Sequence, residues 1–474
     1  MGSAITFGTD GWRGIIAEDF TFQNVRFCAQ GVADYLRETG LHHQGLVVGY
    51  DTRFASEDFA AATAEVVAAN GIRVHLCGEA APIPVISYAI QNLGAGAGVI
   101  ITASHNPGAW NGFKYRLAEA TAAPPQTLVQ LEQHIARTQT AGRTALLSLS
   151  QALQDGMVEM FDPRPAYLQH IAHLVDLPSL RQSGLNLIAD PMYGAGMGYF
   201  KAILGGDSAQ VVEIHGERNP LFPGVRPEPI GPNLGDLCAR VAESGARVGL
   251  ATDGDADRVG IVDEKGTYLT TLQVFALLAL YLLESRGLRG PIIRTITSSA
   301  MLDRLGELYS VPVHQTPVGF KYVAPKMSAE EALIGGEESG GYAFRGHILE
   351  RDGIVSGLFF LDLMVKTQKT PSQLVEYLYS KVGSHHYDRV DIEFAPERRQ
   401  EMVDRLSATR PGSIENVAVV DVQTGDGFRY ILSDSSWLLI RFSGTEPLLR
   451  IYAESDSPQR VQALLTEGKK MAGV

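Results

Sequence analysis

The chain has 474 residues, more than one hydrophobic core usually holds, so its length favours about three or four domains. Its net charge of −13 argues against a nucleic-acid partner or an anionic membrane surface and favours small-molecule substrates. The three cysteines are too few and too scattered for a disulfide framework or a zinc site, which fits a reducing compartment. The N-terminus lacks signal-peptide features, and the apolar run FALLALYLL is too short to span a bilayer. We therefore expect a soluble, unprocessed, cytoplasmic protein, either a monomer or a homodimer.

The same arrangement of predicted elements occurs three times: an apolar strand, a turn of small residues, a helix and a second strand. The copies begin near residues 46, 185 and 291. Each copy is followed by one more apolar strand that ends in a polar loop, with the sequences TASHNP, DGDADR and GGEESGG. Ligands of open α/β sheets bind beyond the carboxyl ends of the strands, so we expect the three loops to converge on one cleft. The alternative is three unrelated loops on separate domains.

The pattern changes after residue 380, where a strand and an amphipathic helix precede the segment WLLIRFSGTEPLLRIYAES. This change indicates a smaller α+β domain. The expected fold class is therefore α/β, with three related α/β domains followed by a smaller α+β C-terminal domain around a central cleft. The expected boundaries lie at proline-containing or polar junctions and give the domains 1–160, 161–263, 264–380 and 381–474.

Ser104 and His105 follow an apolar strand directly and precede a Pro-Gly turn. Neighbouring residues of an extended strand point to opposite faces, so His105 would be badly placed to take the proton of Ser104. The nucleophile-elbow pattern Gly-x-Ser-x-Gly is also absent. The sequence therefore predicts that something other than a neighbouring base activates Ser104.

The segment DGDADR places Asp253, Asp255 and Asp257 at alternate positions, so in an extended segment their carboxylates would share one side. Three hard oxygen ligands suit Mg²⁺ or Ca²⁺. An EF-hand is excluded because Arg258 stands where that loop requires glycine, whereas a solvated acidic turn is the other interpretation. A cation held by three carboxylates has open positions, which Mg²⁺ usually fills in part with phosphate oxygens. This favours a phosphate carried by Ser104.

Two further loops have groups that suit a sugar phosphate. Glu337, Glu338 and Ser339 lie in a glycine-rich segment and could bind vicinal hydroxyls of a sugar, although a surface turn would look similar. RFSGTEPLLR could form an anion cradle of guanidinium groups, hydroxyls and backbone N–H groups, or be an exposed turn. The residues of this cradle are Arg441, Ser443, Gly444, Thr445 and Arg450. Arg13, in the glycine-rich turn GTDGWRG, could face the same phosphate.

Five motifs in this order, GTDGWRG, TASHNP, DGDADR, GEESGG and RFSGTEPLLR, resemble those of the α-D-phosphohexomutases. The resemblance covers essentially the whole chain. It implies three related α/β domains and a fourth of different topology around one cleft, in agreement with the repeated pattern.

The resemblance also implies a role for residues around the reacting phosphate. Ser104 would be the phosphoserine and would bind Mg²⁺ together with Asp253, Asp255 and Asp257. Other residues would lie beside the transferred group or support it, namely Lys114, Arg258, Arg13 and His105. Lys114 is the candidate general base, and crowding by the two arginines would lower its pKa as that role requires.

A second set of residues would bind the substrate. By resemblance, Glu337 and Ser339 would hold sugar hydroxyls, and Lys321 would reach the sugar from the third domain. The phosphate that is not reacting would be held by Arg441, Ser443, Thr445 and Arg450.

The implied reaction moves phosphate reversibly between C1 and C6 of a hexose. Phosphoserine would give its phosphate to the free hydroxyl, the 1,6-bisphosphate would turn over in the cleft, and Ser104 would take back the other phosphate. GEESGG resembles the glucose-type members most, so glucose phosphate leads, with glucose 1,6-bisphosphate as intermediate and activator. Mannose phosphate and a hexose 1,6-bisphosphate synthase are alternatives within the family. A sugar phosphatase would use the same serine and metal but admit water, whereas a non-catalytic sensor should have lost the serine or an aspartate.

Overall fold

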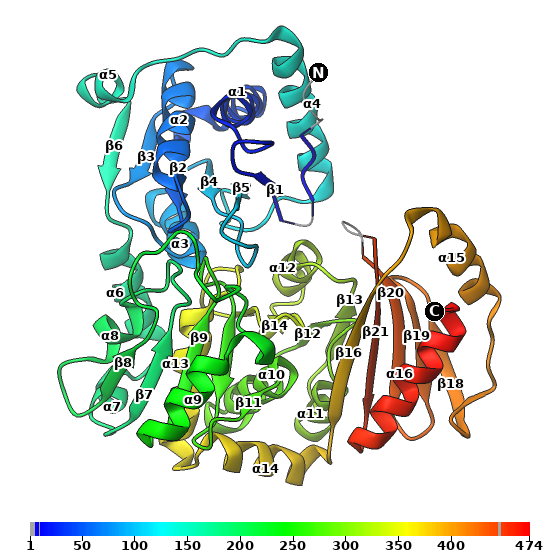
Figure 1. The fold of residues 1–474 in the computed structure, drawn as a ribbon. Coiled ribbons are helices and arrows are strands. Elements are labelled where there is room, and N and C mark those ends of the chain that lie inside the picture. The colour runs from blue at the N-terminus through cyan, green and yellow to red at the C-terminus, as the bar shows by residue number, and fades with distance from the viewer. Residues whose placement is uncertain (1–4, 9, 444–446) are drawn as a thin grey trace.

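The computed structural model describes residues 5–8, 10–443 and 447–474, which form four β-sheets in succession along the chain (Figure 1). Parallel strands occur in each of the first three sheets, and helices connect them. The fourth sheet is antiparallel throughout. The expected fold class, three related α/β domains followed by a smaller α+β domain, is therefore confirmed.

The first sheet has six strands in the order β1-β5-β4-β2-β3-β6. Its strands are β1 (Trp12–Ile15), β2 (Leu46–Tyr50), β3 (Val74–Cys77), β4 (Ala97–Ile101), β5 (Trp110–Leu117) and β6 (Val158–Phe161). The helices of this domain are α1 (Phe22–Glu38), η1 (Leu41–Gln44), α2 (Ser56–Ala69), α3 (Ile83–Leu93), α4 (Pro125–Ala141) and α5 (Leu149–Gln154). Every residue of β2 and β4 is buried, as expected for parallel strands that helices cover on both faces.

The second sheet has five strands in the order β11-β10-β9-β7-β8. Its strands are β7 (Asn186–Asp190), β8 (Gln210–Glu213), β9 (Val248–Thr252), β10 (Val259–Val262) and β11 (Tyr268–Leu269). The helices are α6 (Arg164–Leu174), α7 (Leu177–Arg181), α8 (Tyr199–Leu204), η2 (Gly231–Asn233) and α9 (Gly235–Ser244). β11 pairs with β10, so this sheet includes residues that the sequence assigned to the third domain.

The third sheet has four strands in the order β13-β12-β14-β15. Its strands are β12 (Ile292–Thr295), β13 (Val313–Thr316), β14 (Ile334–Gly336) and β15 (Tyr342–Phe344). The helices are α10 (Thr271–Leu280), η3 (Tyr281–Ser285), α11 (Met301–Tyr309), α12 (Phe320–Ala329), α13 (Gly353–Thr367) and α14 (Pro371–Val382). Nine of the ten residues of α10 are buried, which explains why its sequence is almost entirely apolar.

The C-terminal domain contains a six-stranded sheet in the order β16-β21-β20-β19-β18-β17. Its strands are β16 (His386–Glu393), β17 (Ser413–Ile414), β18 (Val417–Gln423), β19 (Phe428–Leu432), β20 (Trp437–Phe442) and β21 (Leu448–Ser455). The helices are η4 (Pro396–Arg398), α15 (Arg399–Ala408) and α16 (Pro458–Ala472).

The apolar core is continuous through the first three domains, with buried side chains from Ile5 to Val382. The C-terminal domain has its own core, with buried side chains from Phe394 to Ala472. A small cluster that includes Ile296 and Trp437 joins the third domain to the C-terminal domain. The first three domains therefore share one core, whereas the fourth has a separate core and is joined to the third by a small apolar cluster.

Three strands deliver the polar loops expected from the sequence. β4 leads into Ser104, β9 into Asp253 and β14 into Glu337. The loops from β4 and β9 meet directly, because Ser104 Oγ donates a hydrogen bond to Asp253 Oδ2 at 2.9 Å. The loop from β14 reaches them through Arg351, which contacts both Glu337 and Asp257.

No helix within the described ranges is both long enough and apolar enough to cross a bilayer.

Candidate active site

A buried arginine shapes the serine loop (residues 102–109), which follows β4. The Nη2 atom of Arg53 donates to the carbonyl oxygens of Ser104 and Asn106, at 2.6 Å each. Its Nη1 atom donates to the carbonyl oxygens of Pro107 and Trp110. The guanidinium therefore satisfies four carbonyls of one tight turn. Sequence analysis missed Arg53, although its position just beyond the carboxyl end of β2 was an available signal.

The prediction that His105 points away from Ser104 is wrong. Ser104 has φ +52°, so the chain turns at this residue instead of continuing as a strand, and His105 Nδ1 lies 3.3 Å from Ser104 Oγ. Burial and the nearby charges of Arg258 and Arg13 lower the pKa of His105 well below its usual value. His105 is therefore adjacent to Ser104 but is a weak base.

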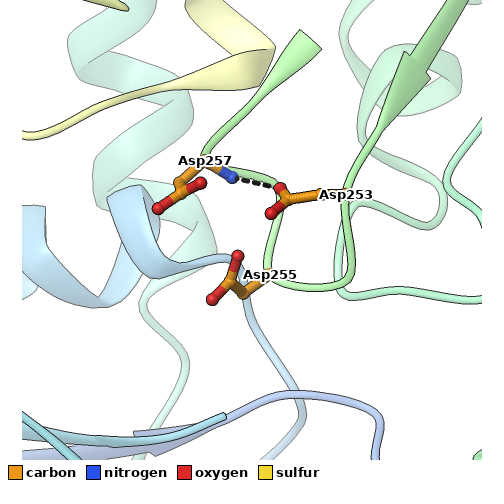
Figure 2. Close-up of side chains that lie close together, drawn as sticks. All are labelled: Asp253, Asp255 and Asp257. Carbon is orange, nitrogen blue, oxygen red and sulfur yellow. Dashed lines mark hydrogen bonds between the residues drawn. The ribbon is translucent and has the colours of Figure 1, made fainter. Parts of the chain in front are cut away.

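The three aspartates of the aspartate loop (residues 253–258) converge, as Figure 2 shows. One carboxylate oxygen from each lies within 4.8 Å of the others, and all three side chains are buried. The loop is not extended, however. Ala256 has φ +56° and its N–H donates to the carbonyl of Asp253, so a turn, and not strand alternation, brings the carboxylates together.

The donor set of this cluster fits a divalent cation. Asp255 Oδ1 and Asp257 Oδ1 are buried and accept no hydrogen bond from the part of the chain that the structure describes, whereas Asp257 Oδ2 lies 2.7 Å from Arg351 Nη2. Buried polar atoms normally have partners, and carboxylate oxygens are the ligands that Mg²⁺ prefers. Burial, with the neighbouring Asp255 and Asp257, raises the pKa of Asp253 well above its usual value. A bound cation would relieve this repulsion.

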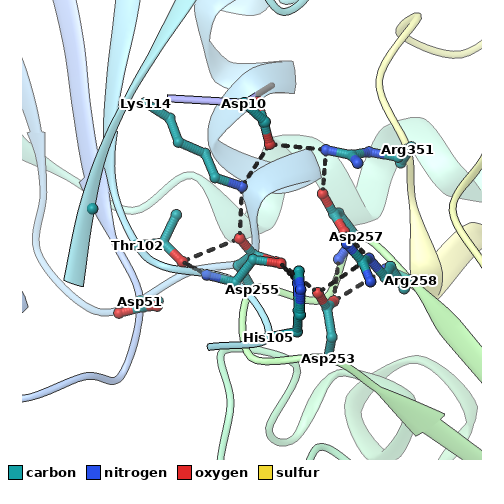
Figure 3. A network of polar contacts seen from close by, with 12 residues as sticks. Asp10, Asp51, Thr102, His105, Lys114, Asp253, Asp255, Asp257, Arg258 and Arg351 are labelled. Atoms are coloured by element: carbon teal, nitrogen blue, oxygen red, sulfur yellow. Dashed lines mark hydrogen bonds and ion pairs between the residues drawn. The ribbon is translucent and has the colours of Figure 1, made fainter. Parts of the chain in front are cut away.

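Lys114, on β5, is held between two carboxylates (Figure 3). Its Nζ atom lies 2.8 Å from Asp10 Oδ2 and 3.0 Å from Asp255 Oδ2. Two carboxylates thus contact the amine where the sequence predicted crowding by arginines, and a role as general base requires this pairing to open. Burial tends to raise the pKa of Asp255, but the charge and hydrogen bond of Lys114, a hydrogen bond with Asp253 and the charge of Arg351 together outweigh it and lower that pKa to about 2.

Arg351 connects loops from three domains and was missed by sequence analysis. Its Nη2 atom lies 2.7 Å from Asp257 Oδ2 and 3.0 Å from Asp10 Oδ2 (Figure 3), and Nη1 lies 3.5 Å from Glu337 Oε2. Burial opposes its charge, yet these carboxylates raise the pKa of Arg351 well above its usual value. The signal available in the sequence was Asp352, whose side chain caps the first turn of α13 and places Arg351 at the helix entrance.

Arg13 contacts the serine loop, and Arg258 is the last residue of the aspartate loop. Arg13 Nη1 donates to the side-chain oxygen of Asn106. Arg258 Nε lies 3.9 Å from Asp253 Oδ2, and Arg258 Nη1 lies 3.5 Å from Glu228 Oε1. Both predicted arginines are thus near Ser104, where they could balance the charge of a phosphate.

The two glutamates of the glutamate loop (residues 336–341) have partners in different domains. Glu337 is buried, and its Oε1 atom accepts the backbone N–H of Gly319. Glu338 instead turns to the C-terminal domain, where its Oε1 atom accepts hydrogen bonds from Tyr387 and Arg389. Ser339 is half-buried beside them. Lys321 lies in the first turn of α12, which follows Gly319.

Two arginines of the predicted anion cradle lie side by side. Arg441, on β20, pairs directly with Arg450, on β21, across the antiparallel ladder. Residues opposite each other in such a ladder share one face of the sheet. Ser443 is buried just beyond β20, whereas Gly444 and Thr445 lie outside the described residues.

Known sequences match this arrangement domain by domain. Residues 4–142, 165–266 and 271–382 match the profiles of the phosphoglucomutase/phosphomannomutase alpha/beta/alpha domains I, II and III. Residues 399–468 match the C-terminal domain of the same family.

Proteins that match along nearly the whole chain have names of the same enzyme family. A protein of Methanothermobacter thermautotrophicus described as "Probable phosphoglucosamine mutase" is 31% identical over 96% of this chain and 95% of its own length. A "Phosphoglucomutase/phosphomannomutase" of Thermococcus kodakarensis is 28% identical over 98% of each chain. A crystal structure of a Thermus thermophilus protein assigned as a phosphomannomutase covers both chains completely, with 34% identity and a TM-score of 0.87.

Fold and relatives together define an enzyme, an isomerase of the mutase type. The chain belongs to the phosphoglucomutase/phosphomannomutase family of the α-D-phosphohexomutase superfamily.

The close contact between the serine and aspartate loops generates the first prediction. A Cβ atom at Gly254 would lie 2.4 Å from the carbonyl oxygen of Ser104, a backbone atom that cannot move aside. Gly254→Ala should push the loops apart and lower kcat/KM at least about tenfold, because misplacing the reacting groups is costly. Steady-state kinetics and thermal unfolding test this. Gly235→Ala, where a Cβ meets nothing within 4 Å, is the matched control and should retain activity.

The second prediction concerns the metal. Asp255→Asn keeps one oxygen but loses the charge that neutralises a cation, so Mg²⁺ affinity measured by calorimetry should fall at least about tenfold. The exposed Asp236→Asn serves as control. EDTA should abolish wild-type activity and added Mg²⁺ should restore it. Full activity in the chelator would exclude the metal role.

Proposed function

We propose that the enzyme interconverts hexose 1-phosphate and hexose 6-phosphate through a phosphoserine at Ser104 and a hexose 1,6-bisphosphate intermediate. The observation that carries the proposal is the position of Ser104 Oγ, 2.9 Å from Asp253 Oδ2 at the edge of a buried carboxylate cluster with unpartnered oxygens. A serine at that place can carry phosphate next to a cation site.

The aspartate loop would hold Mg²⁺ with the oxygen of Ser104, and the cation supplies charge neutralisation for phosphoryl transfer. In the transfer, a sugar hydroxyl oxygen forms a bond to phosphorus and the bond from phosphorus to Ser104 Oγ breaks. The hydroxyl proton is released as Ser104 Oγ gains one, so the proton balance closes. Arg13, Arg258 and Lys114 surround the transferred group and stabilise its charge without a Ser-His-Asp triad.

The second half-reaction requires the bisphosphate to present its other phosphate to Ser104. Arg441 and Arg450 would hold the phosphate that is not reacting, since two neighbouring guanidinium groups bind phosphate in either sugar orientation. Glu337 and Ser339 would hold sugar hydroxyls, with Lys321 nearby on α12.

The hexose is proposed to be glucose, with mannose as the second candidate. A hexose 1,6-bisphosphate synthase is the alternative activity. The side chain of Glu338, a residue of the GEESGG motif, accepts hydrogen bonds from Tyr387 and Arg389 of the C-terminal domain. Its effect on sugar preference would therefore be indirect. Since the relatives include proteins named as phosphoglucosamine mutases, glucosamine phosphate belongs in the substrate test.

The third prediction tests the phosphoserine. Intact-mass analysis of purified protein should show a fraction heavier by one phosphoryl group, and Ser104→Ala should lose both this fraction and nearly all turnover, because the nucleophile is gone. Ser148→Ala, an exposed helix cap remote from the site, should keep both. An active, unphosphorylated Ser104→Ala enzyme would refute the mechanism.

The fourth prediction tests the reaction. A coupled assay of glucose, mannose and glucosamine 1-phosphates should show isomerisation to the 6-phosphate, fastest for glucose and stimulated by glucose 1,6-bisphosphate. Released inorganic phosphate is measured in the same samples. Isomerisation without phosphate release supports the proposal, whereas stoichiometric release would identify a phosphatase and accumulating bisphosphate a synthase.

A further inference from the structure

Arg441 and Arg450, which we propose to bind the non-reacting phosphate, each pair with an aspartate of their own domain. Asp426 Oδ1 lies 3.0 Å from Arg441 Nε, and Asp391 Oδ2 lies 3.5 Å from Arg450 Nε. A guanidinium group has five N–H donors, so a contact at Nε orients the group without using all of its donors. Each aspartate is thus placed to orient the guanidinium group of its own arginine.

Asp426 also links Arg441 to the third domain. Its second oxygen, Oδ2, accepts the backbone N–H of Val318 at 2.8 Å. The next N–H along the chain, that of Gly319, donates to Glu337 Oε1 at 3.0 Å. Gly319 has φ +126°, a conformation that glycine adopts readily and other residues rarely do. Two successive N–H groups of one turn therefore hold a carboxylate of the C-terminal domain and the carboxylate proposed to bind sugar.

The backbone beside Asp426 is packed against the strand that carries Arg441. Gly427 has φ +104°, and a Cβ atom there would lie 2.8 Å from the carbonyl oxygen of Ile440 and 3.1 Å from Arg441 Cβ. This close approach fixes the turn of Asp426 relative to Arg441. The aspartate is consequently a rigid spacer between the arginine and the Val318–Gly319 turn.

A parallel connection runs from Arg450 to the other glutamate of the glutamate loop. Arg389 Nη1 donates to Glu338 Oε1 at 3.1 Å, and Arg389 Nε lies 2.9 Å from Asp391 Oδ1. Asp391, on β16, is directly opposite Arg450, on β21. Adjacent glutamates of one loop are thus each connected, through an aspartate, to one of two adjacent arginines.

We propose that Asp426 is a positioning residue that couples phosphate binding by Arg441 to the glutamate loop. The proposal rests on the function proposed above, because it requires Arg441 to bind the substrate phosphate. Substrate and product carry phosphate at opposite ends of the sugar. The distance from Arg441, which would bind that phosphate, to Glu337, which would bind the sugar, must nevertheless stay constant. Asp426 maintains that distance across two domains that have separate cores. Asp391 provides the equivalent support for Arg450.

Asp426→Ala tests the proposal. The variant should raise KM for hexose 1-phosphate and for hexose 6-phosphate about tenfold, with a smaller fall in kcat, because loss of one charge-assisted contact leaves Arg441 misoriented. Asp426→Asn retains an oxygen that can accept the Val318 N–H, so its KM should fall between those of wild type and Asp426→Ala. Phosphorylation of Ser104 should be unchanged in both.

A double-mutant cycle separates positioning from a merely structural role. If Asp426 acts through Arg441, the double variant Asp426→Ala/Arg441→Ala should have the KM of Arg441→Ala alone. Asp434→Ala is the matched control: Asp434 also pairs with an arginine of the C-terminal domain, Arg460 at 2.7 Å, but at the opposite end of β20. It should leave both KM values unchanged, and thermal unfolding checks that each variant folds.

The outcomes distinguish this inference from the function on which it rests. A raised KM in Arg441→Ala with an unchanged KM in Asp426→Ala would overturn the positioning role alone. Multiplicative losses in the double variant would also overturn it, because the two residues would then act independently. An unchanged KM in Arg441→Ala would overturn the phosphate site and this proposal together.

Discussion

The contact between Ser104 and the aspartate loop is the constraint on which the rest of the site depends. Ser104 Oγ donates to Asp253, and Gly254 lies against the Ser104 carbonyl with no room for a side chain. The two loops extend from different sheets, so their contact requires the first two domains to hold a constant relative position. The apolar core shared by the first three domains meets this requirement.

A second requirement is the balance of buried charge around that contact. Ions removed from water are costly unless they are paired with good geometry. Here Lys114 lies between Asp10 and Asp255, and Arg351 lies between Asp10 and Asp257. Loops of all three α/β domains thus depend on one another electrostatically. In the function that we propose, this network would keep the reacting groups in position when phosphate and cation bind.

The C-terminal domain satisfies a different demand. The mechanism that we propose requires a bisphosphate intermediate to be held while its two phosphates exchange places, and a domain joined to the others by a small apolar cluster suits that demand. This domain has its own core and meets the third domain through the cluster around Ile296 and Trp437. The bridge through Asp426 explains how such a domain can still place Arg441 accurately.

The sequence by itself determined the three repeated α/β units, the different C-terminal domain and the order of the loops, because apolar periodicity and turn residues are local properties of the chain. It also predicted that the carboxylates of Asp253, Asp255 and Asp257 lie together, although a turn, and not the expected strand alternation, brings them together. Only the tertiary structure decided that Ser104 turns toward His105, that carboxylates flank Lys114 and that Glu338 faces the C-terminal domain. Asp10 and Arg351, which meet in the site, are 341 positions apart. Contacts of this kind depend on how separate sheets pack against one another, and no local pattern of residues encodes that packing.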